Sequence, residues 1–450
     1  MPAHSTHPNV LVFFTDQQRW DTTGVHGNPT GLTPNFDRMA QNGTHVYNAF
    51  TCQPVCGPAR ASLQTGLYAT QAGVHHNGIP LPPDKKTLAH HFREAGYATA
   101  YIGKWHLAEG EGPVPATQRG GYEDWLASNV LEFTSDAYHT TLYDNDNRPV
   151  QLPGYRSDAL VDAAIRYVGS KRTKPFLLFL SFVEPHFQNS LDDYPPPDGY
   201  RERYTGSWAP PDLAALGGST YQHLAGYYGM VKRLDEGLGR IVDALKSLGL
   251  LDETIVLFTS DHACHFKTRN GEYKRSCHES SIRVPMALSG PGFEGGGRVQ
   301  QLVSLVDMPP TLLDAAGLPV PSEMAGRSIL PLLRRKRAGW PDEIFVQIGE
   351  SQVGRAVRTR RWKYGVGAPD VHPLEPSADR YKEQYLYDLE CDPYELTNLF
   401  GRDSHGEVSR IMRERLIRRM QQAGEAVPEI EPAPQRRGGQ RRVSDEEARS

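Results

Sequence analysis

The chain contains 450 residues with a formal net charge of −4, and 38% of its residues are hydrophobic. A weakly acidic chain offers no broad basic surface to a phosphate backbone, which excludes nucleic acid as a bulk electrostatic partner. Its five cysteines lack both the spacing of a disulfide framework and a second Cys or His pair at zinc-ligand spacing, so we expect reduced thiols. The length favours one large α/β domain with a smaller one.

The start of the chain carries no recognisable secretory signal. The first apolar run, 10–14, is too short for a signal-peptide core and is followed closely by Asp16. No segment approaches the roughly 18 apolar residues that a membrane-spanning helix needs, so we expect no membrane partner. The chain as written is expected to be cytoplasmic, or periplasmic or secreted if a leader has been removed.

The first half of the chain alternates short apolar runs with helical patterns. This alternation predicts βαβ units and a mostly parallel sheet. The main expected strands are 10–15, 97–102, 176–182 and 254–259, and the expected helices are 34–41, 61–67, 87–95, 157–168 and 220–248.

The composition changes near Gly339-Trp340-Pro341. Beyond it we expect shorter antiparallel strands and then a basic helix, at 343–348, 354–359, 362–366, 385–389 and 408–422. From 428 onward the sequence is rich in Pro, Gln, Arg and Glu without periodicity. We therefore expect a catalytic α/β domain at 1–340, an antiparallel-sheet subdomain at 341–427 that completes the pocket, and a tail at 428–450 that is flexible or strapped on the surface.

Polar residues follow four of the predicted strands. Ligands of an open parallel α/β sheet bind beyond the carboxyl ends of its strands. Any one of these residues could be an ordinary loop residue, but four such ends together indicate one pocket. In chain order they are Asp16 and Gln17, then Lys104 and His106, then His186, and finally Asp261 and His262.

The chemistry of these residues fits a metal beside an anion. Asp16, Gln17, Asp261 and His262 offer three side-chain oxygen ligands and one imidazole, which suits Ca²⁺, Mg²⁺ or Mn²⁺. Positive charge and proton donors near a metal are what a tetrahedral oxyanion requires. The residues expected to supply them are Arg60, Lys104, His106, His186 and Lys274.

The stretch 56–66 reads Cys-Gly-Pro-Ala-Arg-Ala-Ser-Leu-Gln-Thr-Gly. A buried cysteine in a loop interrupted by proline is one explanation. The stretch also opens a predicted helix, whose N-terminus would favour an anion and a lowered thiol pKa. Its Cys-x-Pro-x-Arg core, followed by Thr-Gly, resembles the signature that formylglycine-generating enzymes read in type I sulfatases.

Most of residues 8–400 resembles the type I, formylglycine-dependent sulfatases of the alkaline-phosphatase-like superfamily. The shared stretches occur in the family order. Besides the Cys56 motif they are 8–17, 96–106, 259–262, Lys274, Glu279, 283–285, 386–389 and 392–399. The resemblance implies an α/β fold: a large, mostly parallel sheet flanked by helices, alkaline-phosphatase-like, with a smaller C-terminal α+β domain.

In that family the motif cysteine is oxidised to an aldehyde, and the hydrate of this aldehyde is the nucleophile. The resemblance implies that Cys56 is converted in this way by a formylglycine-generating enzyme and that its hydrate contacts the metal. Asp261 would help the metal, most simply Ca²⁺, to ionise the hydroxyl. Arg60 would orient the hydrate.

The same resemblance assigns the remaining polar groups. Lys104 and Lys274 would hold sulfate oxygens. His186 would protonate the leaving alcohol, and His106 would take the remaining hydroxyl proton to expel sulfate and restore the aldehyde. The activity implied is hydrolysis of a sulfuric ester.

Two positions depart from the commonest sulfatase pattern. Gln17 stands where a second aspartate is frequent, and His262 stands where asparagine is frequent. Both resemble related phosphonate monoester hydrolases and phosphodiesterases, so hydrolysis of such esters is an alternative. A third hypothesis is a non-catalytic protein that binds anionic glycans and keeps Cys56 as a thiol.

The segment 262–283 is rich in cationic side chains. A solvated loop whose charges are offset by Glu272 and Glu279 would explain this. Contact with an anionic glycan would explain it too, and 265–270 resembles sulfatases that act on polysaccharides such as ulvan. The substrate residues expected on that hypothesis are His76, Lys267, Arg269 and Arg355. The expected substrate is therefore a sulfated small molecule or glycan.

Overall fold

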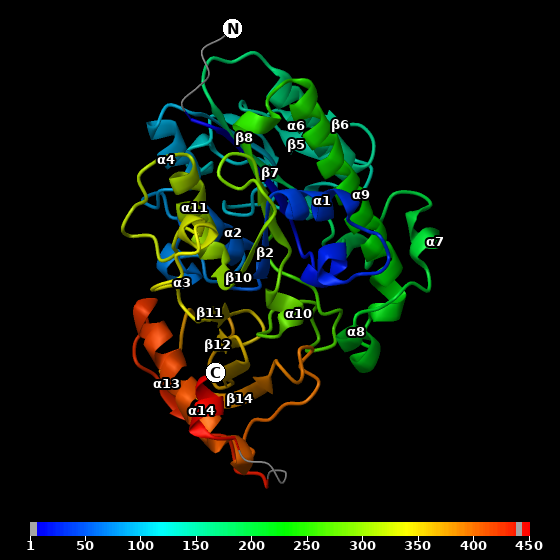
Figure 1. Ribbon diagram of the computed structural model, residues 1–450. Helices are drawn as coiled ribbons and strands as arrows, with labels where there is room; N and C mark the ends of the chain where they lie inside the picture. Colours follow the sequence, from blue (N-terminus) through cyan, green and yellow to red (C-terminus); the bar gives the residue numbers. More distant parts are fainter. Residues whose placement is uncertain (1–6, 438–442) are drawn as a thin grey trace.

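The computed structural model describes residues 7–437 and 443–450 (Figure 1). Its larger part is built on a ten-stranded sheet with the order β10-β2-β9-β8-β1-β7-β3-β4-β5-β6. These strands are β1 (Asn9–Thr15), β2 (Thr44–Phe50), β3 (Ala98–Lys104), β4 (Asp124–Ser128), β5 (Thr140–Tyr143), β6 (Pro149–Leu152), β7 (Phe176–Ser181), β8 (Thr254–Ser260), β9 (Met286–Ser289) and β10 (Gly297–Ser304).

The centre of this sheet is parallel and largely buried. β8, β1, β7, β3 and β4 run in the same direction, and β1 sits between β7 and β8, with Val10 opposite both Leu177 and Ile255. Antiparallel pairing is found toward the edges, where β9 joins β8 to β2 and where β5 and β6 form a hairpin. Strands buried on both faces need the continuous apolar runs that the sequence shows here.

Helices cover the two faces of the sheet, and alternate side chains of β1 enter two separate cores. Val10 and Val12 pack with α2 (Cys56–Thr65), α4 (Leu88–Glu94) and α11 (Met308–Ala315). Leu11 and Phe13 pack on the other side. Figure 1 shows the two helix layers on opposite sides of the sheet. The helices of the second layer are α1 (Pro34–Asn42), α6 (Arg156–Gly169) and α9 (Thr220–Ser247).

The C-terminal part forms a second sheet, which lies below the large sheet in Figure 1. Its order is β11-β12-β13-β14-β15, antiparallel except for β15 beside β14. Its core joins Phe345 and Trp362 to Val408 and Leu416 of the long helix. The elements are β11 (Glu343–Ile348), β12 (Val353–Thr359), β13 (Trp362–Ala368), β14 (Arg380–Asp388), β15 (Glu429–Glu431), α13 (Gly406–Gln422) and α14 (Asp445–Arg449).

The fold class predicted from the sequence is confirmed. The last segment, expected as a tail at 428–450, includes β15 and α14, and the indole N–H of Trp362 donates to the carbonyl of Glu447 at 3.0 Å. Residues 438–442 of that expected tail lie outside the described residues. In the part of the chain that is described, no helix is both long and apolar enough to cross a membrane.

The short helices are α3 (Ala69–Ala72), α5 (Leu131–Thr134), α7 (Tyr200–Tyr204), α8 (Pro211–Leu216), α10 (Glu279–Ile282) and α12 (Leu330–Leu333).

Candidate active site

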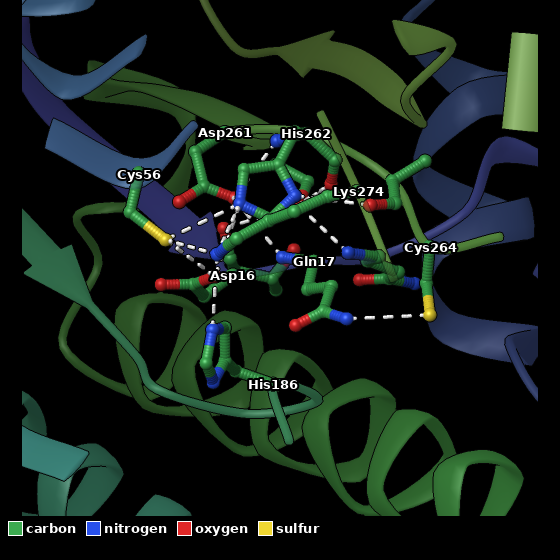
Figure 2. A network of polar contacts seen from close by, with 12 residues as sticks. Asp16, Gln17, Cys56, His186, Asp261, His262, Cys264 and Lys274 are labelled. Carbon is green, nitrogen blue, oxygen red and sulfur yellow. Dashed lines mark hydrogen bonds and ion pairs between the residues drawn. The ribbon is translucent and has the colours of Figure 1, made fainter. Parts of the chain in front are cut away.

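The polar residues predicted at the strand ends meet at one edge of the large sheet, because β1, β3, β7 and β8 are parallel and end on the same side. Cys56 joins them as the first residue of α2, and Lys274 comes from the loop between β8 and α10. Figure 2 shows side chains of this site converging. The strand-end residues are Asp16, Gln17, Lys104, His186, Asp261 and His262.

The sulfur of Cys56 is buried within a cluster of cationic and polar groups. It lies 2.8 Å from Lys274 Nζ, 3.2 Å from His262 Nε2 and 3.5 Å from Asp16 Oδ1. Burial alone would raise the pKa of the thiol, but the charges of Lys104, Lys274 and His262 outweigh it and hold that pKa well below its usual value. The site therefore stabilises negative charge at the position of this residue.

Four side chains form a possible metal site. Ligand atoms of Asp16, Cys56, Asp261 and His262 all lie within 4.8 Å of one another. His262 Nδ1–H donates to the carbonyl of Ala263 at 3.0 Å, which leaves Nε2 facing the cluster. Burial, followed by the neighbouring charge of Asp16, raises the pKa of Asp261 to about 7. Two buried carboxylates this close are what a divalent cation would neutralise.

Gln17 has an orphaned oxygen beside this cluster. Its Nε2 donates to Tyr194 Oη and Cys264 Sγ, both at 3.2 Å, whereas its Oε1 is buried without a hydrogen-bond partner among the described residues. Its backbone N–H donates to Asp261 Oδ1 at 3.0 Å, and Asp261 Oδ2 has no hydrogen-bond partner in the described chain, although it lies 3.5 Å from Arg60 Nη2. Buried polar atoms without hydrogen-bond partners are rare, and these two fit the ligand set of a cation.

Asp16 is held by two cations on the side away from His262. Its Oδ2 accepts from Lys104 Nζ at 2.8 Å and from Arg60 Nη2 at 2.9 Å. Burial and the Cys56 charge would raise the pKa of Asp16, but Lys104, His186 and Arg60 keep it well below its usual value. Asp16 is therefore ionised across the ordinary pH range.

Lys104 has a second carboxylate partner that the sequence did not reveal. Glu132, in α5, accepts from Lys104 Nζ at 2.6 Å. Burial would raise the pKa of Glu132, but Lys104, His106 and His186 lower it to about 2. The sequence did offer one signal for this pair, a glutamate between Leu131 and Phe133 in a short apolar stretch. Such a glutamate is expected to have a cationic partner, because a buried carboxylate is costly unless it is paired.

Two histidines complete the centre of the site. His186 Nδ1–H donates to the carbonyl of Phe187 at 2.6 Å, and its Nε2 lies 3.1 Å from Lys274 Nζ. Burial and the Lys274 charge lower the pKa of His186. His106 has a left-handed backbone with φ of 61°, and its side chain contributes to the lowered pKa of Cys56, while its Nδ1 is buried without a hydrogen-bond partner among the described residues.

The four residues predicted to bind substrate have different surroundings. His76 is half-buried, and its Nδ1–H donates to the carbonyl of Asn77 at 2.6 Å. Lys267 is exposed, with Nζ 5.9 Å from the centre of the Tyr273 ring, which in turn lies 6.5 Å from the ring of His186.

Arg269 and Arg355 are both engaged by protein groups. Arg269 donates to the carbonyls of Tyr394 and Glu395, at 2.7 and 2.8 Å. Arg355 is buried, and its Nε lies 2.9 and 2.8 Å from the two carboxylate oxygens of Glu425. Substrate contact by any of these four residues stays a prediction.

Comparison with known proteins identifies the family. The sulfatase family model matches residues 8–318, and the model for the C-terminal part of N-sulphoglucosamine sulphohydrolase matches 271–422. The chain is 29% identical to an ulvan-active sulfatase of Formosa agariphila, over 93% of this chain and 82% of that protein.

Solved structures share the fold of this chain. The chain resembles the candidate sulfatase yidJ of Bacteroides fragilis with a TM-score of 0.84 and 24% identity, covering 95% of this chain and 98% of that one. It also resembles a phosphonate monoester hydrolase of Agrobacterium radiobacter with a TM-score of 0.71 and 26% identity, over 92% and 96% of the two chains. The sulfatase model covers more than half of the chain, and the chain belongs to the sulfatase family.

Proposed function

We propose that this sulfatase releases sulfate from a sulfated carbohydrate, with Cys56 matured to formylglycine and a divalent metal bound beside it. The observation that carries the proposal is the position of Cys56, whose sulfur lies within 3.5 Å of Lys274, His262 and Asp16 at the start of a buried helix. The carbohydrate substrate is supported by the similarity to the ulvan-active sulfatase. Maturation requires a formylglycine-generating enzyme as a partner.

The residues that would hold the metal are Asp16, Gln17, Asp261 and His262, with the modified Cys56 completing the set. Ca²⁺ is proposed over Mg²⁺ or Mn²⁺ because it accepts many oxygen ligands in irregular geometry. When bound, the cation supplies the positive charge that lowers the pKa of the hydroxyl of the formylglycine hydrate, the nucleophile for sulfur.

Three cations of the chain would position the anionic groups. Lys274 Nζ, 2.8 Å from the Cys56 sulfur, would bind a sulfate oxygen at that point. Lys104 would bind a second oxygen while Glu132 and Asp16 hold its ammonium in place. Arg60, anchored on Asp16 and Ser181, would orient the hydrate. These donors are fixed before the reaction, which is how such sites stabilise developing charge.

The two histidines would move protons at opposite steps. The contact of His186 Nδ1–H with a carbonyl leaves Nε2 as the atom that gives a proton to the leaving alcohol. An anionic sulfate beside it favours the imidazolium form that this step requires. His106, whose side chain contributes to the lowered pKa of Cys56, would accept the remaining hydroxyl proton as sulfate is expelled.

Mass spectrometry and turnover together test this proposal. Protein produced with a formylglycine-generating enzyme should be lighter than the unmodified chain by the mass difference between a cysteine and the aldehyde at Cys56. It should also release sulfate from an aryl sulfate and from sulfated oligosaccharides. Protein that keeps the full thiol mass under these conditions and binds sulfated glycan without turnover would instead support a non-catalytic binding protein.

Hydrolysis of phosphonate or phosphate esters is a second candidate. Gln17 is neutral where a negatively charged aspartate is frequent in sulfatases, and His262 offers an imidazole where asparagine is frequent; the likeness to a phosphonate monoester hydrolase adds support. The two candidates are separated by the ratio of kcat/KM for an aryl sulfate to that for a phenyl phosphonate monoester. A ratio below one would favour the second candidate.

A further inference from the structure

A glutamate of the C-terminal domain joins two segments of the active site. Glu350 follows β11, and its side chain is 11% exposed. Its Oε1 accepts from the backbone N–H of Asn77 at 2.6 Å, and its Oε2 lies 2.5 Å from Nη2 of Arg275. One carboxylate thus binds two segments of the large domain that are far apart in the sequence.

The first contact leads to Cys56. Oδ1 of Asn77 accepts from the backbone N–H of Gly57 at 2.9 Å, in the first turn of α2. A Cβ atom at Gly57 would lie 3.1 Å from that same Oδ1, so the chain approaches Asn77 closely at this point. Asn77 therefore holds the end of the helix from which Cys56 projects.

The second contact leads to Lys274. Arg275 follows Lys274 directly, its N–H donates to the carbonyl of Pro54 at 3.3 Å, and its carbonyl accepts from Ser351 Oγ at 2.7 Å. Because Lys274 Nζ lies 2.8 Å from the Cys56 sulfur, the contacts close a ring. Its members in order are Cys56, Gly57, Asn77, Glu350, Arg275 and Lys274.

The backbone at this junction adopts an uncommon conformation. Glu350 and Arg275 both have left-handed backbones, with φ of 65° and 67°. Residues other than glycine keep such angles only where their surroundings determine them strongly, and such residues cluster at functional sites. Here the ion pair between Glu350 and Arg275 and the hydrogen bond from Ser351 hold these backbone angles in place.

We propose that Glu350 is a positioning residue that sets the separation of Cys56 and Lys274, so that turnover depends on this contact from the C-terminal domain. The inference rests on the proposed function, in which Lys274 holds a sulfate oxygen beside the nucleophile. Glu350 acts through Asn77 and Arg275 and does not touch the reacting atoms. A displacement of about 1 Å between reacting groups is enough to lower a rate about 100-fold.

Kinetics of five variants test the positioning role. Glu350→Ala should lower kcat on an aryl sulfate about 100-fold with KM changed less than about threefold, because the misplaced groups act mainly in the transition state. Glu350→Gln keeps an acceptor for Asn77 and should lose less. In an Arg275→Ala background, Glu350→Gln should have no further effect. Arg419→Gln removes an interdomain hydrogen bond to Tyr68, away from this ring, and should leave kcat unchanged.

Hydrogen exchange supplies a readout that does not need turnover. Glu350→Ala should speed exchange of the amides of Gly57 and Asn77 and of the segment 270–276, and Arg419→Gln should not. If Glu350→Ala speeds exchange but the parent protein does not hydrolyse sulfate esters, the ring of contacts would be supported and the proposed function refuted. The positioning role would be overturned if Glu350→Ala left both amide exchange and kcat unchanged. It would also be overturned if the variant changed KM alone. Glu350→Gln serves for the same measurements if Glu350→Ala does not fold.

Discussion

The ammonium of Lys274 lies 2.8 Å from the sulfur of Cys56 and within 3.2 Å of both His186 Nε2 and His262 Nε2. One side chain therefore joins the position of the nucleophile to the proposed acid and to a proposed metal ligand. From this position the ammonium can bind a sulfate oxygen without a large movement of the neighbouring side chains. Its removal should affect the chemical step more than the fold.

Lys274→Ala should lower kcat/KM for an aryl sulfate about 100- to 1000-fold, the range found when one preorganised donor to a developing anion is removed. The matched control is Lys246→Ala, an exposed lysine of α9. Steady-state kinetics of both variants, matured in the same way, measure the difference. Equal kinetics of the two variants would show that Lys274 does not contact the sulfate.

Changes at Cys56 separate chemistry from binding. Cys56→Ala cannot form the aldehyde but keeps Asp16, Asp261, His262 and the cations, so it should fold, bind metal more weakly and bind substrate without turnover. Cys56→Ser should also be nearly inactive in a maturation system that accepts only cysteine, since a serine hydroxyl has no second hydroxyl to expel sulfate. Multiple turnover by Cys56→Ala near the parent rate would mean that water at the metal is the nucleophile.

Much of the fold and the centre of the site could be predicted, because both depend on local patterns. Strands buried on both faces are continuous apolar runs, as at 176–180, and polar residues after parallel strands must converge. Six strands of the large sheet were missed, namely β2, β4, β5, β6, β9 and β10. In β2 and β10, exposed or polar positions interrupt the apolar pattern. The helix carrying Cys56 was expected only from residue 61, but it begins at Cys56 itself.

Contacts between distant segments could not be predicted in the same way. Glu132 meets Lys104 from the short helix α5, and Glu350 meets Asn77 across 273 positions of the chain. The sequence around Arg355 suggested a substrate contact, whereas the structure places its guanidinium against Glu425. Nothing in the neighbouring residues distinguishes a free arginine from one whose partner lies 70 positions away.

The orientation of the Gln17 amide leads to a prediction about metal affinity. Tyr194 and Cys264 both accept from its Nε2, which leaves Oε1 for the proposed cation. Tyr194→Phe should weaken Ca²⁺ binding by about 10-fold, within the range known for partners that orient metal ligands. Isothermal titration with Ca²⁺ measures it, and Tyr204→Phe, whose hydroxyl lacks a hydrogen-bond partner among the described residues, is the control. Equal Ca²⁺ affinities of the two variants would show that the orientation of the Gln17 amide does not contribute to metal binding.

Lys267 should affect large substrates more than small ones. Its exposed ammonium lies over Tyr273, beside the histidine proposed to protonate the leaving group. Lys267→Ala should raise KM for a sulfated oligosaccharide about fivefold, the scale of an exposed ion pair, and leave an aryl sulfate unaffected. Initial rates on the two substrates compare the effects. An equal change on both would place Lys267 at the sulfate itself.

The last prediction concerns the buried pair of Lys104 and Glu132. The pKa of Glu132 is about 2 in the folded protein, against an ordinary value of 4.5. Its charged form therefore stabilises the fold above pH 4.5, and this contribution is lost as the pH falls toward 2. Glu132→Gln should lower the free energy of unfolding by about 3 kcal/mol at pH 7, as expected when one partner of a buried pair is removed.

The difference between parent and Glu132→Gln should shrink to about 1 kcal/mol near pH 2.5, where the parent carboxylate is largely protonated in the unfolded state and partly so in the folded state. Urea unfolding at both pH values measures it. Glu94→Gln is the matched control, because Glu94 pairs with Lys86 at 2.8 Å on the surface, where both side chains are 54% exposed. That pair should contribute little at either pH, since water screens it. A parent-to-variant difference for Glu132 that stayed constant between pH 7 and pH 2.5 would show that packing, rather than the charge held by Lys104, accounts for its effect.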